Sequence, residues 1–88
     1  MRARQAARVD NTAKALRKYA ESIGFVVVVL NTVVDCLLVW GSRVIITDWK
    51  SPGGSLTPAQ ATLVAKGVPI RFISRTEQLD ALRVELQA

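Results

Sequence analysis

The sequence has no histidine and only one cysteine among its 88 residues. These absences exclude a disulfide within the chain, a zinc site built from Cys and His, and any catalytic triad that depends on His. The single cysteine, Cys36, stands inside an apolar run, so we expect a small core residue rather than a nucleophile. A metal site in this chain must therefore use oxygen ligands, which favours Mg²⁺ or Mn²⁺ over softer metals.

Long hydrophobic runs are also missing. The longest apolar stretch, residues 23–30, is far shorter than the roughly 20 residues that a transmembrane helix requires. The first residues contain arginines but no apolar signal core, so nothing indicates secretion and we expect a cytoplasmic location. The length predicts one small domain, with residues 1–7 as a basic N-terminal tail and residues 8–88 as the folded part.

Apolar residues and positive charge are abundant. Half of the residues are hydrophobic, which is high for so small a surface, and we expect some of that area to close a homodimer interface. Residues 1–18 carry six basic side chains and one acidic side chain, whereas the remaining residues carry six of each. We expect Lys14, Arg17 and Lys18 to contact a nucleic-acid backbone, although a solvated helix face would carry the same charges.

The pattern of apolar residues predicts an α/β fold with three helices and four strands. Apolar spacing of three and four residues indicates helices, and short β-branched runs indicate strands. The run that begins at Phe25 is apolar on both faces, and Gly41-Ser42 forms a tight hairpin turn. The expected elements are a helix over residues 8–22, strands over 25–30, 37–40 and 43–49, a helix over 58–66, a strand over 68–73 and a final helix that Thr76 caps.

The expected elements fit one compact domain with a mixed sheet. The first three strands form an antiparallel meander, and the helix over residues 58–66 lets the fourth strand join by a crossover. Asp10 or Asn11 would cap the first helix, and Gly24 would end it. Thr57 and Gln60 have the spacing of a capping box around Pro58.

Two acidic residues interrupt apolar strands. Counted outward from the Gly41-Ser42 turn, Asp35 and Asp48 are equally distant, so we expect them to be near cross-strand neighbours. Lys50 lies two residues beyond Asp48 and therefore on the same face of the strand. A divalent cation would relieve the repulsion of the two carboxylates, and Lys50 would orient a water or offset charge on a phosphate. The alternative is a turn residue at Asp35 and a surface ion pair between Asp48 and Lys50.

Together these residues resemble the PD-(D/E)XK nuclease superfamily, which has a restriction-endonuclease-like core. The most similar branch is the VRR-NUC domain in its minimal, phage-type form, which is like Holliday-junction resolvases. The resemblance covers roughly residues 8–83. The motifs that carry it are Asp35, Asp48-Trp49-Lys50, the Gly-rich residues 53–54, Leu56-Thr57-Pro58-Ala59-Gln60 and Ser74-Arg75-Thr76-Glu77.

The resemblance implies a site and an activity. Asp35 and Asp48 would be metal ligands together with the Trp49 carbonyl, Lys50 would be the catalytic lysine, and Gln60 would project into the site. The implied reaction is Mg²⁺- or Mn²⁺-dependent cleavage of branched DNA such as Holliday junctions, by a homodimer. If the protein is encoded by a phage, it would act in the host cytoplasm.

The chain departs from the family pattern at several places. Val34 stands where the family has Pro, Val33 stands where it has a small residue, and the second acid is Asp48 where close relatives have Glu. The first helix usually supplies a Glu near the site, and here only Asp10 and Glu21 are available. An alternative function is therefore a nucleic-acid-binding module that retains the nuclease fold but cuts poorly.

Overall fold

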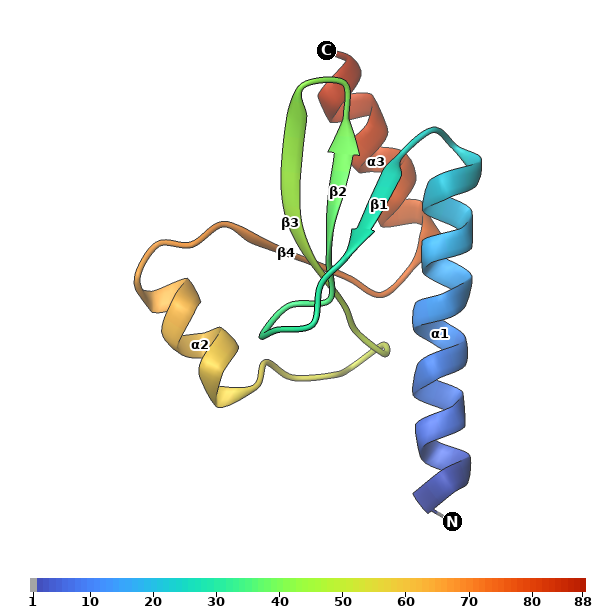
Figure 1. Cartoon of the computed structure of the whole chain (residues 1–88), viewed down its shortest axis with the longest axis vertical. Coiled ribbons are helices and arrows are strands. Elements are labelled where there is room, and N and C mark those ends of the chain that lie inside the picture. Colours follow the sequence, from blue (N-terminus) through green and yellow to red (C-terminus); the bar gives the residue numbers. More distant parts are fainter. Residues whose placement is uncertain (1) are drawn as a thin grey trace.

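A computed structural model describes the backbone of residues 2–88 and the side chains of residues 12–88. The order of elements is the one predicted (Figure 1). The elements are α1 (Arg2–Ser22), β1 (Val26–Val29), β2 (Cys36–Trp40), β3 (Arg43–Trp49), α2 (Pro58–Ala65), β4 (Ile70–Ile73) and α3 (Thr76–Gln87). The fold is a three-helix, four-stranded α/β domain, as the sequence indicates.

The four strands form one mixed sheet in the order β1-β2-β3-β4. β1, β2 and β3 are an antiparallel meander, and β4 lies parallel to β3. Gly41 has a φ of 61°, a left-handed conformation that suits glycine, and it closes the β2–β3 turn. The connection from β3 to the parallel β4 passes through α2. The predicted meander and crossover are both confirmed.

The sheet has one covered face. Because side chains alternate along a strand, Cys36 and Leu38 of β2 point to the same side as Ile73 of β4 in this register. The first and third helices pack on that side (Figure 1). The buried core consists of Leu16, Ala20, Phe25, Cys36, Leu38, Ile73, Leu79 and Leu82. Cys36 is thus a core residue, as expected from the sequence.

The opposite face of the sheet is largely open. Val26, Val28 and Val44 point to it and keep 61%, 42% and 59% of their surface exposed. β1 is also an edge strand, so its apolar run is not buried on both sides, contrary to what its composition indicates. We call the side of the sheet that carries Val26, Val28 and Val44 the open face.

Two predicted helix starts are wrong. The first helix begins at Arg2 instead of residue 8, so the backbone at Asp10 and Asn11 is inside the helix and neither residue caps it. The third helix has Arg75 rather than Thr76 at its cap position, where the Gln78 side chain accepts from the Arg75 amide at 3.1 Å. The division of the chain into residues 1–7 and 8–88 stays a prediction.

Two strands, β1 and β4, are shorter than predicted, each for a local reason. The backbone N–H of Leu30 donates to the Asp35 carbonyl at 2.8 Å, so it closes the β1–β2 connection. β4 begins only at Ile70, because Pro69 has no amide hydrogen to donate to a neighbouring strand. Gly24, with a φ of 110°, follows α1 as predicted.

Candidate functional site

Asp35 and Asp48 meet where β2 begins and β3 ends. Cys36 pairs with Thr47, so Asp35 and Asp48 occupy the next position outward along the two strands. The Asp35 amide donates to Asp48 Oδ1 at 3.1 Å, and the Trp49 amide donates to Asp35 Oδ2 at 2.9 Å. The structure therefore brings the two predicted carboxylates together, as the count from the hairpin turn indicates.

The two carboxylates differ in their surroundings. Asp48 is buried, whereas Asp35 lies at the surface of the site. Partial desolvation raises the pKa of Asp35 above its ordinary value, and the nearby Asp48 carboxylate adds to this rise. The hydrogen bond from the Trp49 amide and the charge of Lys50 oppose it. Asp35 thus experiences a net unfavourable environment for its negative charge.

Lys50 is held between three groups. Its Nζ lies 3.1 Å from Asp48 Oδ2 and donates to Gln60 Oε1 at 2.8 Å. The same ammonium lies 5.7 Å from the centre of the Phe72 ring, a cation–π distance. Lys50 is therefore oriented on the same side of the site as Asp48, and the predicted ion pair between them exists.

Gln60 is buried, with only 2% of its surface exposed, and it makes four hydrogen bonds. Its Oε1 accepts from Lys50 Nζ and from the Thr57 amide, and its Nε2 donates to the Val33 carbonyl at 2.9 Å. Its amide donates to Thr57 Oγ1 at 3.2 Å, which completes the predicted capping box. One conformation of Gln60 therefore caps α2 and contacts Lys50 at the same time.

The donor set fits a hard divalent cation. Two carboxylates and one ammonium leave the group formed by Asp35, Asp48 and Lys50 with a net negative charge. Mg²⁺ is commonly held by one or two carboxylates, with water and substrate phosphate completing the shell. Among the residues 12–88 whose side chains are described, no group of three or more acidic, Cys or His side chains could hold a metal. The Trp49 carbonyl stays a predicted ligand.

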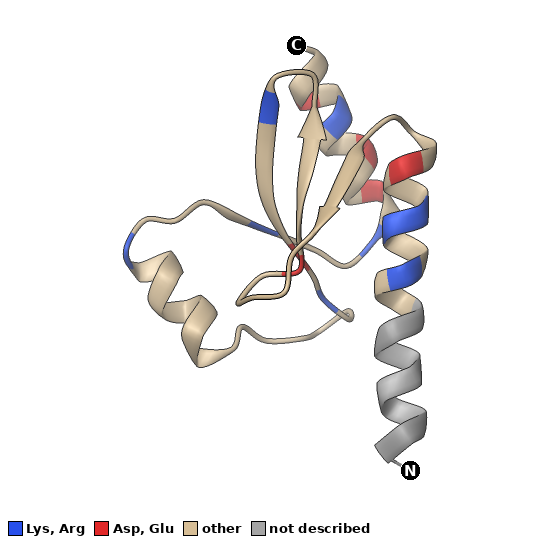
Figure 2. Cartoon of the chain, viewed as in Figure 1, with Lys and Arg blue, Asp and Glu red and all other residues tan. Residues whose placement is uncertain are grey.

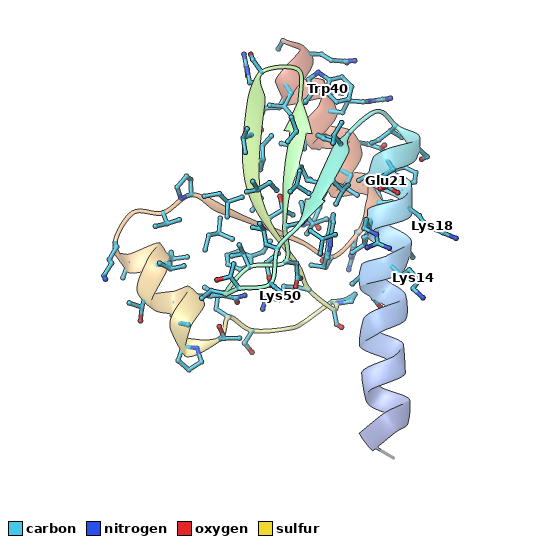
Figure 3. The ribbon with its side chains drawn as sticks, viewed as in Figure 1. Lys14, Lys18, Glu21, Trp40 and Lys50 are labelled. Atoms are coloured by element: carbon cyan, nitrogen blue, oxygen red, sulfur yellow. The ribbon has the colours of Figure 1, made fainter. Side chains whose placement is uncertain are left out.

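The third acid expected from the first helix is not Glu21. Figure 3 places Glu21 toward the end of α1 that leads into β1, whereas Lys50 lies at the other end of the sheet. The side chain of Asp10, the other predicted acid, lies outside the described residues. In the described part of α1, the charged residues that line a pocket beside Asp35 are the basic residues Lys14 and Arg17.

A pocket of about 320 Å³ opens between α1 and the Asp35 end of the sheet. Its lining includes Lys14 and Arg17 of α1, Val29 and Leu30 at the end of β1, and Asp35 and Trp49. Figure 2 shows the described basic positions of α1 beside the part of the sheet that carries acidic residues. Lys14 and Arg17, two of the three predicted nucleic-acid contacts, therefore line the same pocket as Asp35. The Lys18 side chain projects from α1 away from the sheet (Figure 3).

The sequence did not reveal two contacts of the site. Val33 contributes a backbone carbonyl, which leaves no signal in its side chain. Phe72 of β4 pairs with Asp48 of β3, and these two strands are parallel. Because no short turn joins them, their register cannot be counted from the sequence. Arg71 of β4 lies outside the site and pairs with Glu85 of α3.

No family model, no curated protein and no solved structure matches this sequence or fold. Within the described residues, no helix is both long and apolar enough to cross a membrane. The geometry of the site is therefore the main basis for inferring a function.

Proposed function

We propose that this protein is a metal-dependent endonuclease that hydrolyses phosphodiester bonds in DNA, with branched DNA such as Holliday junctions as its substrate. The observation that supports the proposal is the convergence of Asp35, Asp48, Lys50 and Gln60 from three separate segments. A surface ion pair needs no buried glutamine and no second carboxylate beside it. The resemblance to VRR-NUC domains supports the same reaction.

Each residue has a defined task in this proposal. Asp35 and Asp48 would hold Mg²⁺ or Mn²⁺ together with the Trp49 carbonyl; when bound, the cation polarises the scissile phosphate. Lys50 orients the attacking water or offsets the charge that develops on the phosphate. Gln60 does not touch substrate and instead positions Lys50 through its Oε1. Lys14, Arg17 and Lys18 contact the DNA backbone.

The direct test is cleavage of labelled four-way junctions and matched linear duplexes with Mg²⁺ or Mn²⁺. We expect wild type to cut the junction, and we expect Lys50→Ala and Asp48→Ala to reduce the rate at least about 100-fold, because one group that stabilises the transition state is lost. Lys66→Ala is the matched control, since Lys66 is an exposed lysine at the end of α2. Equal cleavage by wild type and Lys50→Ala would overturn the proposal.

A second candidate is a module that binds nucleic acid without cutting it. The observation in its favour is that Lys50 already lies 3.1 Å from Asp48 Oδ2, where it compensates that charge without a metal. Calorimetry distinguishes the two functions. A binding module should show no Mn²⁺ binding and a DNA affinity that falls steeply with salt. Mn²⁺ binding that is lost in Asp48→Ala favours the nuclease.

We also propose that the protein acts as a homodimer through the open face. Val26, Val28 and Val44 leave apolar surface uncovered there. The residues of β1, β2 and β3 on that side are all apolar until Asp48, near the end of β3. A twofold dimer would carry two sites, which suits paired incisions in a junction.

A further inference from the structure

The pocket beside Asp35 has the size of a small-ligand site. Its volume is about 320 Å³, near the lower end of the range for pockets that bind small molecules. A base-paired duplex cannot enter a space of this size, whereas a single nucleotide can. Because Asp35 is part of the wall, whatever occupies the pocket lies directly beside the proposed metal site.

The helix side of the pocket attracts an anion. Arg17 is half-buried, and its guanidinium forms no hydrogen bond or ion pair with any other side chain in residues 12–88. The guanidinium also lies near the thiol of Cys36. Burial raises the pKa of this thiol, and the positive charge of Arg17 opposes that rise. A partly desolvated guanidinium without a carboxylate partner is well suited to a phosphate, which can accept two of its N–H groups. Lys14 adds a second positive charge to the same wall.

Apart from Asp35, the sheet side of the pocket is apolar and aromatic. Val29 and Leu30 line it at the end of β1, and Trp49 lines it from the end of β3. Surfaces of this kind accept the flat face of any nucleobase, and such contacts depend little on base identity. The pocket therefore combines a basic wall that suits a phosphate with an apolar wall that suits a base.

We propose that this pocket holds one unpaired nucleotide of the DNA substrate, with its phosphate on Arg17 and its base against Leu30 and Trp49. The inference rests on the proposed function and narrows its substrate class. DNA that offers an unpaired nucleotide beside the scissile bond, such as a bulge or a splayed junction arm, is preferred to a fully paired duplex.

The first experiment changes the DNA and leaves the protein intact. Three duplexes of one sequence are compared: fully paired, with a one-nucleotide bulge, and with an abasic residue at the bulge. Binding is measured by anisotropy in EDTA, and 2-aminopurine at the bulge reports burial of the base. We expect the bulged duplex to bind about tenfold more tightly than the other two, as is typical of a stacked base. Equal affinity of the base-containing and abasic bulges would overturn the inference.

The second experiment fills the pocket. Val29 and Val84 are each 62% exposed, so a larger side chain at either position meets solvent rather than core. Val29→Trp should abolish the preference for the bulge, whereas Val84→Trp on α3 should keep it. Arg17→Gln should weaken binding of the bulged duplex, and Arg43→Gln at the far hairpin should not. A bulge preference that survives Val29→Trp would also contradict the inference.

These outcomes separate the pocket from the proposed chemistry. Metal-dependent cleavage without any effect of the unpaired base would leave the nuclease function standing and reject the pocket as a nucleotide site. Base-dependent binding without cleavage in Mg²⁺ or Mn²⁺ would keep the nucleotide site and reject the nuclease function.

Discussion

Asp35 carries a charge that the fold disfavours. Its pKa is raised in the folded protein, so the folded state binds its proton more tightly than the unfolded chain does. The ionised form therefore reduces stability at every pH above the folded pKa. This cost falls as the pH is lowered through that value and vanishes below the unfolded pKa of about 3.9.

Replacing Asp35 with Asn should remove this cost. The amide oxygen can still accept from the Trp49 amide, while repulsion with Asp48 disappears. We expect Asp35→Asn to be more stable than wild type at pH 7 by about 0.5 kcal/mol, a small value because Asp35 is solvent-exposed. Urea unfolding at pH 7 and pH 3 checks this, with the difference absent at pH 3. Lower stability of Asp35→Asn than of wild type at pH 7 would contradict this prediction. Because Asp35 is a proposed metal ligand, Asp35→Asn should also fail to cut DNA.

Lys50 competes with a metal for Asp48. Its Nζ lies 3.1 Å from Asp48 Oδ2, so a bound cation must share that oxygen with an ammonium. Lys50→Met should bind Mn²⁺ several-fold more tightly than wild type, because a nearby positive charge is gone, although cleavage is lost. Titration calorimetry measures the affinity, and Lys66→Met serves as the control. Weaker Mn²⁺ binding by Lys50→Met would show that Lys50 does not oppose the metal.

The second helix is tied to the site by one side chain. Gln60 links α2 to Lys50 and to the Val33 carbonyl, and it is the only buried residue of that helix. Gln60→Ala should destabilise the protein by about 1–3 kcal/mol and speed hydrogen exchange in α2, since the Val33 carbonyl and Lys50 lose a buried partner. Gln60→Glu should not restore stability, because a carboxylate cannot donate to that carbonyl.

Thr62→Ala is the matched control for this prediction. Its hydroxyl donates only to the Pro58 carbonyl within α2, at an exposed position. Exchange in α2 and cleavage should both stay near wild type in this variant. If Gln60→Ala leaves exchange in α2 unchanged, then Gln60 does not hold the helix.

The sequence predicts the elements and much of the candidate site, because the relevant signals are local. The Gly41-Ser42 turn fixes the strand register, and the register alone places Asp35 beside Asp48. The capping box likewise fixes the start of α2. Whether a strand is covered is not local. The valines of β1 are all apolar, yet nothing in their own segment shows that α1 covers the face with Val27 and that no helix covers the face with Val26 and Val28.

The pocket depends on the packing of α1 against the sheet. The helical pattern shows that Lys14 and Lys18 share a face, since they are four residues apart, but it does not show which basic residue turns toward Asp35. That distinction needs the angle at which the helix crosses the strands. The structure separates Arg17, in the pocket wall, from Lys18, which projects away from the sheet.

At the scale of the whole molecule, the two faces of the sheet are unequal. One face packs on α1 and α3, and the open face carries Val26, Val28 and Val44 in contact with solvent. A specific dimer interface buries about 800 Å² on each partner, and its centre is depleted of charged residues. The centre of the open face has no charged strand residue, because Asp48 lies at one end of that face.

Val28→Glu should therefore convert a dimer into a monomer. In a twofold interface one substitution introduces two carboxylates, which must lose water and repel each other across the axis. Sedimentation velocity should show wild type as a dimer at micromolar concentration and Val28→Glu as a monomer of unchanged fold. Val84→Glu, on α3 and away from the open face, should remain dimeric. If Val28→Glu is as dimeric as wild type, the interface lies elsewhere. Each protomer holds its own Asp35, Asp48 and Lys50. The monomer should therefore still nick a junction once but lose the paired incision.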